Sequence, residues 1–232
     1  MGIYYNFKKI FNFKVPIFLK KLLKKNYGKN NLDIQLEKYL NFSNGFFIEL
    51  GAHDGITQSN TYYYEKKSNW RGILIEPTPK LFKICKKNRS QKNSFFCNAC
   101  VGFDYKKKDV KLIYSNLKTT SVDLTSNLYR KKHLADPELN FFEKQKNFKA
   151  KAKTLNSILL ESNAPNIIDF FSLDVEGAEF EVLNGIDYNQ FNFRYIIIET
   201  NEFNKLKKFL NNKKYQFIKK FNFNDYLFRS QK

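Results

Sequence analysis

Short apolar runs alternate with amphipathic stretches along most of this chain. The first apolar run, Gly45–Leu50 (GFFIEL), is typical of a buried strand and leads into a turn with two glycines. Later runs of the same kind predict strands at Arg71–Pro77, Ser94–Gly102, Ile167–Val175 and Arg194–Thr200. Helical spacing between them predicts helices at Tyr62–Trp70, Leu81–Gln91, Thr154–Ser162, Glu176–Gly185 and Asn201–Lys213. This alternation predicts an α/β fold around a mostly parallel sheet.

Three segments depart from this alternation. Residues 1–40 are basic and aromatic and predict an N-terminal extension with two short amphipathic helices, at Ile17–Asn26 and Leu32–Leu40. Tyr105–Lys153 is polar and lysine-rich without a sustained period, which predicts an irregular loop or lid on the substrate side. Tyr215–Ser230 predicts an antiparallel hairpin. We therefore expect an extension over residues 1–40 and one domain over 41–232, with an insert at about 105–153.

Acidic and polar residues recur where the predicted parallel strands end. Carboxyl ends of parallel strands share one edge of the sheet, and ligands bind at that edge. The residues expected there are Glu49, Gly51, His53, Asp54, Gly55, Glu76, Pro77, Asn98, Asp174, Glu176, Gly177, Glu199, Thr200 and Asn201. This edge has many acids and no lysine-bearing phosphate loop, so a polyphosphate cofactor is disfavoured and a nucleoside that carries a cation is favoured. S-adenosylmethionine fits, with Glu76 placed to accept both ribose hydroxyls.

Two segments carry a specific resemblance: Phe47–Phe82 and Ile168–Asp187 (IDFFSLDVEGAEFEVLNGID). They resemble the paired signature segments of the FkbM family of S-adenosylmethionine-dependent methyltransferases. The resemblance implies a Rossmann-like class I methyltransferase fold, with strand order 3-2-1-4-5-7-6, and methylation of hydroxyl groups, commonly on sugars or polyketides. It also implies a loop that binds the methionine part of the cofactor, an S-N-T segment that this chain matches at Ser59–Thr61, and an acidic residue that binds the ribose. The cofactor-binding residues we expect are Glu49, Gly51, Ala52, Asp54, Gly55, Ser59, Asn60, Thr61, Glu76, Pro77, Asn98 and Asp174.

Asp174 is the residue most suited to the chemistry. Methyl transfer to a hydroxyl requires removal of the O–H proton while oxygen, methyl and sulfur are held in line. Asp174 could act as the base, orient the hydroxyl, or hold a divalent ion such as Mg²⁺ or Mn²⁺ together with Glu176 and Glu199. His53, in the cofactor loop, is the second candidate for the catalytic base.

Charge and cysteine content bear on partners and location. The formal net charge is +19, from dispersed lysines with few arginines. This charge suits an anionic partner, but it also accompanies the chain's abundance of Lys, Asn, Ile and Phe, so its role stays open. Scarce arginine disfavours a specific nucleic-acid binder. Three cysteines without framework spacing favour a reducing, cytoplasmic location, and residues 1–26 suit peripheral contact with the anionic inner face of a membrane.

The sequence therefore predicts an S-adenosylmethionine-dependent O-methyltransferase. The expected acceptor is a sugar, as a nucleotide-sugar or a surface-polysaccharide unit such as a capsule component, and the basic middle segment would suit a diphosphate. The alternative is an RNA methyltransferase or a nucleic-acid-binding protein on the same fold. The absence of an N-P-P-Y-type motif after the fourth strand counts against that alternative.

Overall fold

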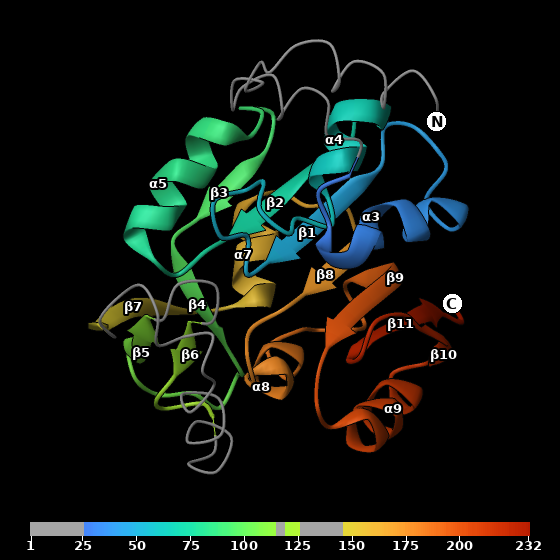
Figure 1. Cartoon of the computed structure of the whole chain (residues 1–232). Coiled ribbons are helices and arrows are strands. Elements are labelled where there is room, and N and C mark those ends of the chain that lie inside the picture. The colour runs from blue at the N-terminus through green and yellow to red at the C-terminus, as the bar shows by residue number, and fades with distance from the viewer. Residues whose placement is uncertain (1–25, 115–118, 126–145) are drawn as a thin grey trace, which may run out of the picture.

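The computed structural model describes residues 26–114, 119–125 and 146–232. In these ranges the chain forms two sheets with helices packed around the larger one (Figure 1). No helix in the described ranges is both long and apolar enough to cross a bilayer. The predicted helix at Ile17–Asn26 lies outside the described residues except for Asn26.

The larger sheet has seven strands in the order β10-β11-β9-β8-β1-β2-β3. Read from the other edge, this is the predicted order 3-2-1-4-5-7-6, and it is confirmed. All neighbouring pairs are parallel except those made by β11, which runs antiparallel to both β9 and β10. The strands are β1 Phe46–Leu50, β2 Arg71–Ile75, β3 Ser94–Phe96, β8 Ile167–Leu173, β9 Asn192–Glu199, β10 Tyr215–Lys220 and β11 Asp225–Ser230.

Both faces of this sheet are buried, which explains the continuous apolar runs of its central strands. On one face, Ile48 and Leu50 pack with side chains from α7, α8 and α9. On the other face, Phe47 packs with residues of α3, η2 and α4. The helices are η1 Lys29–Asn31, α3 Leu32–Gln35, η2 Leu36–Lys38, α4 Tyr62–Ser68, α5 Pro79–Asn88, α7 Leu155–Glu161, α8 Glu179–Leu183 and α9 Phe203–Asn212.

The smaller sheet corrects the expectation of an irregular segment for the described parts of Tyr105–Lys153, whereas residues 115–118 and 126–145 of that segment lie outside the described residues. Its order is β4-β7-β5-β6, with β4 Asn98–Val101, β5 Asp109–Tyr114, β6 Thr120–Ser121 and β7 Lys146–Thr154. Its inward side chains, among them Val110, Leu112 and Ala150, form a small core of their own. The predicted strand at Ser94–Gly102 is also divided, since Cys97 separates β3 in one sheet from β4 in the other.

The predicted helix at Leu32–Leu40 is a set of short turns instead. Asn30 and Asn31 have positive φ angles of 53° and 62°, and the helical pieces that follow are each only three or four residues long. Leu32, Leu36 and Leu40 are nevertheless buried against the sheet, so the amphipathic spacing correctly identified which side chains of this segment pack into the core.

Candidate functional site

A hollow of about 700 Å³, open to solvent, lies at the carboxyl ends of β1, β2 and β8. Predicted site residues that line it are Gly51, His53, Glu76, Pro77, Asn98, Asp174 and Glu176. The smaller sheet supplies another wall, with Leu112, Thr119, Ser121 and Leu124. Sequence reasoning missed this wall, although it placed the segment on the substrate side.

Gly51 explains why the turn after β1 excludes a side chain. Its φ is +88°, and a Cβ at this position would lie 2.0 Å from the backbone oxygen of Asp174. The Asp174 N–H in turn donates to the Leu50 oxygen at 3.1 Å. The turn after β1 and the end of β8 are therefore in direct backbone contact at the edge of the hollow.

Glu76 follows β2 and is almost completely buried beside the hollow. One carboxylate oxygen accepts the His53 N–H at 2.9 Å, and the other accepts the Thr78 N–H at 2.8 Å. Burial raises the pKa of the Glu76 carboxyl, and these hydrogen bonds oppose the rise. Each oxygen keeps a lone pair that can accept a hydroxyl from the hollow.

Asp174 follows β8 and lines two hollows at once. The second hollow is lined also by Lys29, Asn60, Glu199 and Asp225. Water reaches the Asp174 side chain, but the surrounding protein raises the pKa of its carboxyl, and the nearby Glu176, Glu199 and Asp225 raise it further.

The second hollow has polar walls. Besides the residues above it includes Gln58 and Ser172, and the Asn60 amide donates to the Ser172 hydroxyl at 3.1 Å. The amide oxygen of Asn60 is buried without a hydrogen-bond partner. Burial first and then Glu199 raise the pKa of Asp225. The predicted site residues Asn60 and Glu199 thus meet Asp174 here and do not line the larger hollow.

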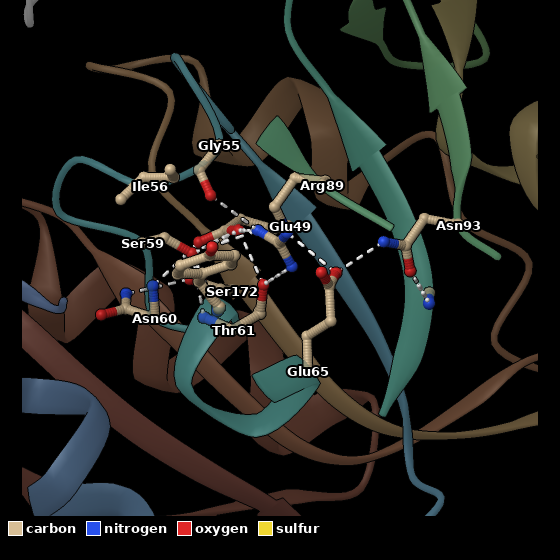
Figure 2. A network of polar contacts seen from close by, with 12 residues as sticks. Glu49, Gly55, Ile56, Ser59, Asn60, Thr61, Glu65, Arg89, Asn93 and Ser172 are labelled. Atoms are coloured by element: carbon tan, nitrogen blue, oxygen red, sulfur yellow. Dashed lines mark hydrogen bonds and ion pairs between the residues drawn. The ribbon is translucent and has the colours of Figure 1, made fainter. Parts of the chain in front are cut away.

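A buried arginine organises the other predicted cofactor residues. Arg89 lies just after α5, with its side chain fully buried, and contacts Glu49 at 3.0 Å and Glu65 at 2.9 Å (Figure 2). It also donates to the Gly55 oxygen at 3.1 Å and the Thr61 hydroxyl at 2.9 Å. A Cβ on Gly55 would lie 2.8 Å from the Arg89 side chain, so this glycine makes room for it.

The Glu49 carboxylate is fully engaged inside this network. It accepts the Ser59 hydroxyl at 2.9 Å, the Asn60 N–H at 2.9 Å and the Thr61 hydroxyl at 2.7 Å (Figure 2). Ser59 also accepts the Tyr62 N–H at 3.0 Å at the start of α4. The network residues Glu49, Gly55, Ser59 and Thr61 line neither hollow, and their contact with a cofactor stays a prediction.

The turn residues between Gly51 and Gly55 have separate roles. Ala52 is buried in the core, and Asp54 accepts the N–H groups of Ile56 at 2.9 Å and Thr57 at 2.7 Å. Burial alone would raise the pKa of Asp54, but the His53 ring and these hydrogen bonds lower it far below its usual range. His53 has φ of 49°, and its ring nitrogens have no hydrogen-bond partner, with Nδ1 3.6 Å from Asp54.

The predicted metal ligands do not form a recognisable metal centre. Asp174, Glu176 and Glu199 all lie at this edge, but nowhere in the described ranges do three His, Cys, Asp or Glu side chains converge as metal ligands. Cys97 and Cys100 are free thiols, and burial raises the pKa of the Cys100 thiol to about 12, so it stays protonated at neutral pH.

Comparison with known proteins gives one family match and two similar structures. The family model of the methyltransferase FkbM domain matches residues 49–225. The methyltransferase FkbM from Methylobacillus flagellatus KT is 10% identical, with a TM-score of 0.47 over 88% of this chain and 56% of that one. The precorrin-6y C5,15-methyltransferase from Geobacter metallireducens GS-15 is 11% identical, with a TM-score of 0.42 over 89% of this chain and 90% of that one. No curated protein matches.

This chain thus spans little more than half the length of the Methylobacillus protein. The family match, by contrast, covers most of this chain. It begins at Glu49 in β1 and ends at Asp225 in β11, and so contains both hollows apart from Lys29 and Leu32. The chain belongs to the FkbM family of methyltransferase domains.

Proposed function

We propose that this chain is an S-adenosylmethionine-dependent O-methyltransferase that methylates a hydroxyl of a sugar, as a nucleotide-sugar or surface-polysaccharide unit. The position of Asp174 carries the proposal. Asp174 lines both hollows, so one carboxylate could serve a methyl donor in one hollow and an acceptor in the other. A cytoplasmic location and a role in polysaccharide or capsule synthesis belong to the same proposal.

The larger hollow fits the cofactor that the family implies. When bound, S-adenosylmethionine supplies the methyl group on a sulfonium centre. Glu76 would hold the ribose hydroxyls, because its buried carboxylate is fixed by two backbone N–H groups and keeps free lone pairs. Pro77, Asn98 and Ala99 line the adjacent part of the hollow, where the base would lie.

The second hollow suits a polyhydroxylated acceptor. Beside Leu32, Leu173 and Ile197, residues with amide, hydroxyl and carboxylate side chains line it, and such groups can donate to and accept from hydroxyls. Asp174 would take the proton of the reacting hydroxyl. Its raised pKa makes it a stronger base than an ordinary carboxylate, which is the direction that this step needs. We assign this step to the carboxylate alone and not to a metal ion held with Glu176 and Glu199.

The test is a transfer assay with S-adenosylmethionine and a panel of nucleotide-sugars, read by product mass, with and without EDTA. We expect a product heavier by one methylene on a sugar hydroxyl, equal yields in both arms, and no product from Asp174→Asn. Glu202→Gln, at an exposed acid with a single lysine partner, is the matched control and should keep activity. Methylation of RNA and of no sugar would overturn the proposal, and loss of activity with EDTA would restore the metal role.

A further inference from the structure

The turn that joins β10 and β11, Phe221–Asn224, presents one aromatic side chain to solvent. Phe223 is 89% exposed, the highest value among the large apolar side chains of the described residues. The turn lies at the carboxyl edge of the sheet, because Asp225, the first residue of β11, pairs with Glu199, the last residue of β9. Asp225 lines the second hollow, so Phe223 lies only two residues from the wall of that hollow.

The exposure of Phe223 is built into the turn, because the other turn residues are held by the fold. Phe221 packs edge-on against Tyr39, and its N–H donates to the Asp225 oxygen at 2.8 Å. The Asn222 side chain donates to Asp225 at 3.0 Å. Asn224 donates to Asn201 at 2.9 Å. These contacts leave only Phe223 facing outward.

Two lysines end β10 directly before this turn, one on each face of the hairpin. Lys219 and Lys220 are adjacent in β10, so their side chains point to opposite faces. The Lys219 ammonium lies 5.0 Å from the ring centroid of Phe221, and the Lys220 ammonium lies 5.4 Å from that of Tyr226. Both lysines are exposed, and no ion pair involves either of them in the described part of the chain.

The N-terminal segment enters the fold beside this turn. The Asn222 amide approaches the Lys29 oxygen at 3.5 Å, and Lys29 also lines the second hollow. Residues 1–26, which precede it, contain seven lysines, many apolar residues and no acid. An exposed aromatic ring in a turn that directly follows two exposed lysines matches the interface of an anionic bilayer, where the ring is buried and the lysines meet lipid phosphates.

We propose that Phe223, Lys219 and Lys220 form a contact with an anionic phospholipid bilayer. This contact sets the second hollow against the lipid surface. If the proposed function holds, its acceptor sugar is then carried on a lipid and reaches Asp174 from the membrane side.

Binding of the full chain to lipid vesicles tests the contact without any methyl transfer. Sedimentation would use vesicles of phosphatidylglycerol with phosphatidylcholine, and vesicles of phosphatidylcholine alone. Phe223→Ala should weaken binding to the mixed vesicles by about tenfold to a hundredfold, as expected for an aromatic side chain leaving an apolar phase. Lys219→Ala with Lys220→Ala should weaken it by about tenfold, and less at high salt. The wild-type chain should bind the neutral vesicles more weakly.

Phe103 provides a matched control, because it is 51% exposed but lines a different hollow, with Asp187 and Lys232, away from the hairpin turn. Phe103→Ala should bind like the wild type. Phe223→Trp should show a blue-shifted emission that lipid-borne quenchers reduce, whereas Phe103→Trp should show neither change. The native Trp70 is 2% exposed and gives a constant background.

Wild-type vesicle binding by Phe223→Ala, or an unshifted emission from Phe223→Trp, would overturn the proposal. Equal binding to neutral and anionic vesicles would overturn the assignment of the lysines. If Phe223→Ala lost only turnover of a soluble sugar acceptor, the residue would be an acceptor contact and not a lipid contact. The vesicle-binding and emission results do not depend on whether the acceptor proposed above is right.

Discussion

Several carboxyl groups in and around this site hold their protons more tightly than carboxyl groups in water, whereas Asp54 holds its proton less tightly. Burial raises the pKa of Glu76 and Asp174, and it raises that of Glu179, at the start of α8, to about 7. Such shifts are common where a site needs a base or a buried hydrogen-bond acceptor. Because the folded-state pKa of these carboxyl groups is raised, ionisation of each one lowers the free energy of unfolding by a measurable amount.

Asp174→Asn should separate catalysis from stability. We expect turnover to be lost while cofactor affinity stays within about tenfold, because the amide keeps the shape but cannot accept the hydroxyl proton. The folded-state pKa of Asp174 is raised, so its ionisation destabilises the fold as pH rises. The variant should therefore unfold at a higher temperature than the wild type at pH 8. Normal turnover would move attention to His53 as the base.

Glu76→Ala should weaken S-adenosylmethionine binding by about 1.5–3 kcal/mol, the range for a lost charge-assisted hydrogen bond. The substitution also frees the His53 and Thr78 N–H groups, so affinity alone does not identify the ribose contact. Calorimetry with a cofactor analogue that lacks the ribose hydroxyls supplies the control. The loss should nearly vanish for that analogue, and an equal loss for both ligands would make the role structural.

Glu179 gives a pH-dependent prediction. Its pKa rises from its ordinary value to about 7 mainly because of burial, although the Gly177 N–H donates to it at 2.7 Å. Its contribution to stability is present below about pH 4.5 and is lost as pH rises through about 7. Glu179→Gln should therefore raise the free energy of unfolding relative to wild type by about 1–3 kcal/mol at pH 8 and little at pH 4. Denaturation curves with the same gain at both pH values would contradict the shift.

At the scale of elements, the turn after β1 depends on a contact from far along the chain. Arg89, after α5, neutralises Glu49 from β1 and Glu65 from α4, and it also contacts the turn itself. The guanidinium has enough donors to reach all of these groups at once, and a lysine ammonium does not. The network therefore joins three elements around the base of the site.

Arg89→Met should destabilise the fold by about 3–5 kcal/mol, because it leaves two buried carboxylates without their cation. Arg194→Met is the matched control: Arg194 is 57% exposed and pairs with Asp169 at 3.3 Å. That exposed pair should contribute no more than about 1 kcal/mol. Chemical denaturation of both variants tests the difference. Equal losses would mean that the buried network is not what holds the turn.

The sequence predicted the elements whose signal is local. The strands of the larger sheet and the rim with Glu76 and Asp174 followed from apolar runs and strand ends, whereas the order of the strands was implied by the resemblance to the FkbM family. In β7, Phe148, Ala150 and Ala152 alternate with lysines, which is a strand pattern, but small apolar residues among many charges hid it. The Arg89 network could not be predicted, because its members are up to 40 positions apart and a single arginine among lysines is a weak signal.

At the scale of the whole molecule, the charge is unevenly distributed. The formal net charge is +19, yet the two hollows at the carboxyl edge are lined by Glu76, Asp174, Glu176, Glu199 and Asp225. An acidic site in a basic protein attracts a cationic ligand locally and anionic surfaces at a distance. The proposed sulfonium-bearing cofactor would bind in the acidic site, and the proposed anionic bilayer would be attracted by the basic remainder of the protein.

The way the smaller sheet is joined to the larger one has a thermodynamic consequence. Cys97 alone separates β3 from β4, and α7 begins at Leu155, directly after Thr154 ends β7. Chain connections this short transmit any loss of order from one sheet to the other. Scanning calorimetry should therefore record one cooperative transition, with equal calorimetric and van't Hoff enthalpies. An early separate transition would show that the wall of the larger hollow melts independently of the sheet that carries Glu76 and Asp174.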